Sequence, residues 1–213
     1  MNFRRILITV LISVSAVYAQ QKPGAANTSA KSADDSQLYR NSTFGFRYRI
    51  AYGWVDRTKD LQEIDEQKPQ ESPNSGSQKG EVLLAIFERP PQAAGDTVNS
   101  AVVIASESAT SYPGLKSAAD YLGPLNEITT AKGFKPDGDP QEVTIDSRTL
   151  IRADFSKSLN DKLTMYQSTL VLLENKQIVS FTFIAGSKDE IGDLIDGLDF
   201  QGRLVPSASR PKK

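Results

Sequence analysis

The chain of 213 residues contains no cysteine and no histidine. Without cysteine it can form neither disulfides nor a thiol nucleophile, and without both residue types it lacks the usual ligands of zinc sites. The serine–histidine–aspartate arrangement of many hydrolases is excluded for the same reason. A general base working near neutral pH would therefore have to be a carboxylate, a lysine or a tyrosine with a shifted pKa.

An excess of charge of one sign is also missing. The chain has 25 basic and 26 acidic residues and a formal net charge of −1. Because no basic excess favours nucleic acid or anionic lipid, we expect no nucleic-acid partner. The sequence also contains no repeat, no glycine-rich phosphate loop, no Walker lysine and no dinucleotide fingerprint, and we expect no cofactor.

The first 19 residues have the pattern of a secretory signal peptide. Arg4 and Arg5 precede an apolar run at 6–17, which is too short to span a bilayer comfortably. Cleavage is expected after Ala19; the alternative is an uncleaved N-terminal anchor. Cleavage leaves 23 basic residues (25 less these two) against 26 acidic ones, a net charge of about −3. With no cysteine for a lipoprotein anchor, we expect a secreted or periplasmic protein without a stable membrane anchor.

Composition divides the rest of the chain into one domain and two polar ends. Residues 20–37 carry too little apolar surface to offset the entropy of ordering them, so a flexible leader is expected there. Residues 38–200 form the domain, and 201–213 form a disordered tail. Within the domain, residues 62–80 are expected to form a mobile loop, with one helical turn around Leu61 and Ile64.

The clearest pattern in the domain is a hairpin followed by a helix. Residues 162–173 and 177–185 are apolar on both faces, which is typical of strands in the middle of a sheet, and Glu174-Asn175-Lys176 separates them as a turn. Ser187 and Glu190 form a capping box. One helical face is expected to carry Ile191, Leu194, Ile195 and Leu198.

Further strands and a second helix come earlier in the chain. Residues 81–88 and 101–105 predict one hairpin, and residues 141–145 and 149–156 predict another. Arg152 and Asp154 share a face of the latter and are expected to pair. Ser117 and Asp120 cap a helix that Pro124 kinks or splits.

An aromatic run opens the domain. Phe44, Phe46, Tyr48 and Ile50 alternate with Arg47 and Arg49, which point the other way. These aromatic residues, closed by Trp54, are interpreted as the buried face of an edge hairpin; a ligand platform is the alternative.

This run resembles the start of a PsbP-like domain. It reads Tyr39-x-Asn41-x-x-Phe44-Gly45-Phe46-x-Tyr48-x-Ile50-x-Tyr52-x-Trp54. The family includes the extrinsic PsbP subunit of photosystem II and many exported bacterial proteins, and its fold resembles a nuclear-import factor that binds the GTPase Ran. The resemblance extends over residues 38–200, although the family usually has a proline before the tryptophan and lacks the long insert. It implies docking onto a larger protein assembly.

Together the patterns predict an α+β fold. The element order indicates a mostly antiparallel sheet of about six strands with helices on both sides, in agreement with the α/β/α sandwich that the resemblance implies.

Acidic residues are the remaining candidates for chemistry. Asp137 and Asp139 in a Pro-Asp-Gly-Asp-Pro loop are interpreted as a plain turn rather than a cation site, because further oxygen ligands are missing. The acidic residues of the last helix are interpreted as a solvated face rather than a catalytic pair; they are Asp189, Glu190, Asp193 and Asp196. We therefore assign no catalytic, cofactor-binding or metal-binding residue.

Three functions remain open. The first is a non-enzymatic binding or accessory protein of the cell envelope that docks onto an unknown envelope protein or assembly. The second is a small-ligand or lipid-binding protein with a cleft between sheet and helix. The third is a hydrolase without histidine or cysteine, for which facing carboxylates in such a cleft would be required.

Overall fold

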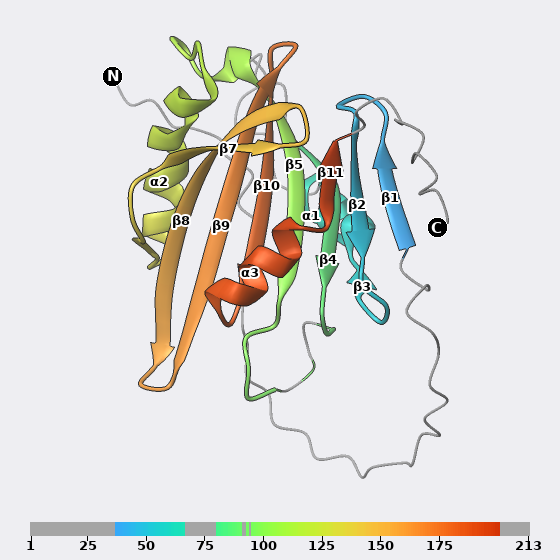
Figure 1. Ribbon diagram of the computed structural model, residues 1–213, viewed down its shortest axis with the longest axis vertical. Helices are drawn as coiled ribbons and strands as arrows, with labels where there is room; N and C mark the ends of the chain where they lie inside the picture. The colour runs from blue at the N-terminus through green and yellow to red at the C-terminus, as the bar shows by residue number, and fades with distance from the viewer. Residues whose placement is uncertain (1–36, 67–79, 91–92, 94, 201–213) are drawn as a thin grey trace, which may run out of the picture.

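The computed structural model describes residues 37–66, 80–90, 93 and 95–200. Two antiparallel sheets organise this part of the chain (Figure 1). The smaller sheet has the order β1-β2-β11 and is built from β1 (Gln37–Asn41), β2 (Phe46–Ile50) and β11 (Leu198–Phe200).

The larger sheet has eight strands. Seven of them lie in the order β3-β4-β5-β10-β9-β8-β6, and β7 pairs with β8 beside β6. Their bounds are β3 (Val55–Asp56), β4 (Glu81–Phe87), β5 (Ala101–Ser108), β6 (Lys135–Pro136), β7 (Gln141–Ile145), β8 (Arg148–Asn160), β9 (Leu163–Glu174) and β10 (Gln177–Ala185).

The helices are short and lie outside the large sheet. They are α1 (Thr58–Glu66), α2 (Leu122–Ala131) and α3 (Lys188–Ile195), with two 3-10 turns, η1 (Ala109–Ser111) and η2 (Ala118–Tyr121).

The predicted central hairpin is confirmed. Strands β9 and β10 lie in the middle of the large sheet and pair with each other from Glu174 and Gln177 onward. Asn175 and Lys176 form the two-residue turn between them with positive φ angles of 50° and 61°. Two consecutive positive φ angles match the right-handed twist of the flanking strands.

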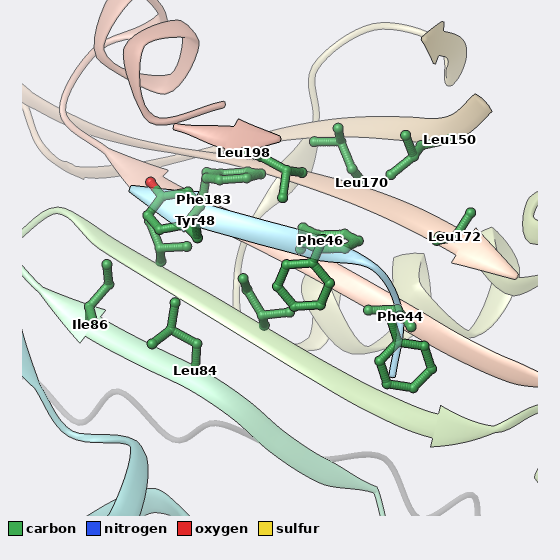
Figure 2. Packing of buried hydrophobic residues seen from close by; sticks show 14 of the residues in the cluster. Phe44, Phe46, Tyr48, Leu84, Ile86, Leu150, Leu170, Leu172, Phe183 and Leu198 are labelled. Atoms are coloured by element: carbon green, nitrogen blue, oxygen red, sulfur yellow. The ribbon is translucent and has the colours of Figure 1, made fainter. Parts of the chain in front are cut away.

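One face of the large sheet is covered by the small sheet and α3. The side chains of β2 point into this layer, where they meet the inward residues of β4, β5, β9 and β10 (Figure 2). The ring centroids of Phe46 and Phe181 lie 5.1 Å apart, and Phe200 completes an edge-to-face group with both. The Tyr48 hydroxyl donates a hydrogen bond to the Leu194 carbonyl across 2.9 Å, which ties α3 to β2.

The opposite face is covered by two helical segments. Below η2 and α2, Tyr112, Tyr121, Leu125 and Phe134 pack on side chains of β8, β9 and β10. Leu61 of α1 packs on a separate cluster at the β4 and β5 side. Side chains from the covering elements therefore reach the sheet on both of its faces.

The α+β class, the mostly antiparallel sheet and the cover on both faces are confirmed, and two details are corrected. The expected count of about six strands is too low, because β3 and β6 have two residues each and β11 has three. Such strands are too short to show an alternating pattern. Leu198 belongs to β11 rather than to the last helix, which ends at Ile195.

The helix predicted after Ser117 is split in two, which is one of the two outcomes expected from Pro124. The segment splits into η2 and α2, and Pro124 lies in the first turn of α2, where its missing N–H is not needed. Gly133, with φ 85°, follows the end of this helix.

Several predicted segments lie wholly or partly outside the residues that the structure describes. The signal peptide at 1–19, most of the leader, residues 67–79 of the loop and the tail at 201–213 are outside them. Gln37 belongs to β1 rather than to the leader, and residues 62–66 of the expected loop are helical in α1. Among the described helices, none has the length and apolar character needed to cross a membrane.

Candidate functional site

The inward residues of β2 and of the turn before it belong to the core. Phe44, Phe46, Tyr48 and Ile50 are all buried, with Phe46 fully inaccessible. Trp54 is half-buried and packs against the same cluster. The interpretation of the run as one buried face is therefore confirmed, and no ligand platform remains there. The hairpin is not an isolated edge, however, because β2 is the central strand of the small sheet.

The Asp137 and Asp139 loop forms contacts within the protein. The backbone N–H of Asp137 donates to the Asp154 carbonyl across 2.8 Å, and its carboxylate pairs with Lys188 of α3 across 2.8 Å. Hydrogen bonding to Asp137 raises the pKa of Lys188. Among the described residues, no group of three or more acidic side chains is arranged to hold a metal ion.

Two further contacts lie close to this pair, an ion pair within β8 and a cation–π contact of Lys188. Arg152 Nε and Asp154 Oδ1 pair across 2.9 Å, as predicted. The Lys188 ammonium lies 5.8 Å from the centroid of the Tyr166 ring. The two contacts of Lys188 hold the start of α3 against the Asp137 loop and against β9.

The acidic residues of α3 have different roles. Ser187 is the N-cap residue: its Oγ accepts a hydrogen bond from the Glu190 N–H across 3.1 Å, and the Glu190 carboxylate accepts from Gly186 N and from Ser100 Oγ. Asp189, Asp193 and Asp196 are exposed. Glu190 is thus used in capping the helix, and the other three carboxylates are solvated.

A buried carboxyl group, which the sequence pattern does not reveal, lies near the end of β5. Glu107 is 7% exposed near the end of β5 and accepts hydrogen bonds from two tyrosines. The Tyr112 hydroxyl donates to its Oε2 across 2.5 Å, and the Tyr121 hydroxyl donates to its Oε1 across 2.8 Å. The two rings meet edge to face with centroids 5.2 Å apart.

Burial dominates the electrostatics of this group, which we call the Glu107 cluster (Glu107, Tyr112 and Tyr121). Desolvation raises the pKa of Glu107, and the two tyrosine hydrogen bonds lower it by less. Desolvation and the neighbouring carboxyl group raise the pKa of Tyr121, so its hydroxyl stays a donor. Because the three side chains satisfy one another in the interior, the cluster anchors the 109–121 segment to the sheet.

The outward face of the small sheet is the most distinctive described surface. Arg40 lies directly opposite Arg47, and Leu38 directly opposite Arg49, in the pairing of β1 with β2. Directly opposed residues share one face of a sheet, and this face is opposite to the buried aromatic side. Asp199 of β11 lies on the other side of Arg47 and forms an ion pair with it. We call these five residues the arginine face.

Accessibility differs along the arginine face. Arg40 and Arg49 are exposed, and Leu38 is 44% exposed. Tyr52, in the turn that follows β2, is 75% exposed. Alternation predicted the direction of Arg47 and Arg49, but the positions of Arg40 and Asp199 follow from strand pairing, which the sequence does not reveal.

Comparison with family models finds no match, and no curated protein matches the chain. Solved structures do match. The solution structure of cyanobacterial PsbP from Synechocystis is 10% identical, with 83% of this chain and 98% of that chain covered and a TM-score of 0.47.

Two further solved structures are similar at the same level. The Ran-binding protein Mog1p of Saccharomyces cerevisiae is 8% identical, with 78% and 95% of the two chains covered and a TM-score of 0.43. LpqN of Mycobacterium tuberculosis, described as involved in cell envelope biogenesis, is 14% identical, with 79% and 91% covered and a TM-score of 0.38. The structural neighbours of this chain thus include PsbP, whose family the aromatic run resembles, and a Ran-binding factor, whose fold that family resembles; the likeness is one of fold.

Proposed function

We propose that this chain is an exported, non-enzymatic accessory protein of the cell envelope that acts by docking onto another protein. The observation that carries the proposal is the packing of the interior. The rings of Phe46, Phe181 and Phe200 meet between the two sheets, and Tyr121 and Leu125 pack below α2. Side chains thus occupy the layers where a ligand cleft would have to open, which leaves the surface for recognition.

The residue types support a role without catalysis. A chain with neither histidine nor cysteine must use carboxylates, lysines or tyrosines for proton transfer. The carboxyl group with a raised pKa, Glu107, is buried and held by two tyrosines. Asp189, Asp193 and Asp196 are exposed to solvent, where a carboxylate keeps its charge without a neighbouring acid.

Export is the second part of the proposal and rests on the N-terminal sequence. The expected product of processing begins at Gln20. Intact-mass analysis of protein recovered from the periplasm or the medium tests this directly, because retention of Met1 in that fraction would contradict cleavage after Ala19.

Affinity purification tests the docking role. The exported, tagged protein is crosslinked mildly in cells, recovered from its own envelope fraction and analysed by mass spectrometry, with an unrelated exported protein carrying the same tag as the control. A partner present in stoichiometric amount with this chain and absent from the control is the expected result. Recovery of background proteins together with a lipid or small molecule would overturn it in favour of ligand binding.

A further inference from the structure

We propose that the arginine face is the docking surface and that it recognises a carboxylate-rich patch or segment of a partner protein. This inference rests on the proposed docking function and identifies the surface and the chemistry of the partner. Strands β1, β2 and β11 contribute three arginines and one carboxylate to this face. A local positive charge stands out in a chain whose net charge is −1.

Contacts among the described residues neutralise one of the three arginines, Arg47. Like charges directly opposite each other on neighbouring strands destabilise a sheet, and Arg40 is directly opposite Arg47. Asp199 compensates Arg47 through its ion pair. Neither Arg40 nor Arg49 forms an ion pair with another described residue, and both side chains are exposed.

The side chains beside the arginines suit a protein surface. Leu38 lies directly opposite Arg49 with 44% of its surface exposed, and Tyr52 follows β2 with 75% exposed. Arginine and tyrosine are enriched at protein interfaces, where they combine apolar contact with hydrogen bonding. The planar guanidinium groups of arginines match carboxylates in a bidentate geometry.

The same face fits an anionic membrane less well. Binding to anionic lipid relies on clusters of about four to eight basic residues. Here three arginines are present, all on one sheet face, and one of them is neutralised by Asp199. The acidic partner is therefore expected to be a protein.

Two matched double variants test the proposal. In the first, Arg40→Gln and Arg49→Gln remove the two uncompensated charges. In the control, Lys59→Gln and Lys135→Gln remove the same charge from two exposed lysines on α1 and β6. All four positions are exposed, and equal urea midpoints will establish that both variants fold as the parent does.

The probe is a fluorescein-labelled poly-L-glutamate peptide, with binding followed by anisotropy at low salt and at about 0.5 M salt. We expect salt-sensitive binding by the full chain, a loss of about tenfold or more in the arginine variant, and little change in the lysine variant. An equal loss in both variants, or no binding by the parent protein, would overturn the proposal. Stronger binding to phosphatidylglycerol vesicles than to the peptide, lost in the arginine variant, would assign the face to membranes instead.

The same variants separate this inference from the docking function. If the arginine variant captures the envelope partner in undiminished yield, the docking function stands and the arginine face is wrong. If it alone loses that partner, and poly-L-glutamate displaces the partner from the parent protein, both are supported. If the parent captures no partner, the docking function falls, and the peptide measurement still decides whether the face binds carboxylates.

Discussion

The hydroxyl of Tyr121 donates a hydrogen bond to Oε1 of Glu107 across 2.8 Å, in the interior below α2. Together with Tyr112 it satisfies a carboxyl group that burial would otherwise leave unpaired. This contact joins the 3-10 turn η2 to the end of β5, and two predictions follow from its geometry.

The first concerns Tyr121→Phe, which removes one donor and leaves the ring in place. We expect the free energy of unfolding to fall by about 1–3 kcal/mol, because a buried acceptor loses a partner. Urea unfolding measures it. The control is Tyr52→Phe at the exposed turn, for which a change below about 0.5 kcal/mol is expected. Equal effects in the two variants would show that the buried hydrogen bond does not contribute.

The second prediction concerns pH. The pKa of Glu107 is raised in the folded protein above its ordinary value of 4.5. In the interval between the two values the folded state binds more protons than the unfolded state, so this group makes the free energy of unfolding fall as pH rises. Its favourable contribution is complete below about pH 4.5 and is lost as pH rises through the folded-state pKa.

Glu107→Gln tests this prediction, because a neutral amide cannot titrate. Over that interval we expect the difference in unfolding free energy between Glu107→Gln and the parent protein to move in favour of the variant as pH rises. The exposed Glu142→Gln serves as the control variant. A difference that is constant with pH, measured by urea unfolding at each pH, would rule out the assignment.

Residue-level patterns explain why the fold was largely predictable and the Glu107 cluster was not. Long strands such as β9 and β10 carry enough apolar residues to be recognised from the sequence, and Asn175 marks the turn between them. Strand β5 was expected to end at Ala105, since Ser106 and Glu107 look like loop residues. Burial of Glu107 depends on tyrosines that reach it from the following segment, and only the three-dimensional path of the chain brings them there.

The sequence predicted part of the arginine face. Alternation along β2 placed Arg47 and Arg49 opposite the aromatic residues. Which residues would lie beside them depended on β1 and on β11, and a three-residue strand at the end of the domain has no periodicity to read. The alternating pattern therefore could not predict that Asp199 lies beside Arg47.

The third prediction concerns the turn between β9 and β10. Lys176 has a φ of 61°, which costs energy for a residue with a Cβ atom. We expect Lys176→Gly to raise the free energy of unfolding by about 0.5–1 kcal/mol, since Asn-Gly is the preferred pair for this turn. Lys162→Gly, in the turn between β8 and β9, is the control. Lys162 does not have a positive φ, so glycine there is expected to lower stability. Thermal unfolding of both variants shows whether each substitution raises or lowers the stability of the protein.

The fourth prediction concerns the core between the two sheets. Phe46 is fully buried and contacts Phe181 and Phe200. Phe46→Ala is expected to lower the free energy of unfolding by about 3–5 kcal/mol, because it removes apolar contact and leaves a cavity. Phe46→Leu should cost less and keep the protein folded for measurement by urea. If Phe46→Ala were no worse than Phe46→Leu, the close packing of this layer would be in doubt.

The position of β11 has a consequence for how the chain reaches its final state. Strand β2 has one neighbour close to it in sequence and a second, β11, whose Asp199 is 152 residues from Arg47. The backbone N–H of Phe200 donates a hydrogen bond to the Asp146 carboxylate across 2.8 Å, so β11 is also held against the β7–β8 turn. Until residue 200 has been made and released, Phe46 and Tyr48 lack part of their cover. Closing this long loop is entropically costly, so we expect the small sheet to complete late in folding and the chain to stay unfinished throughout its synthesis.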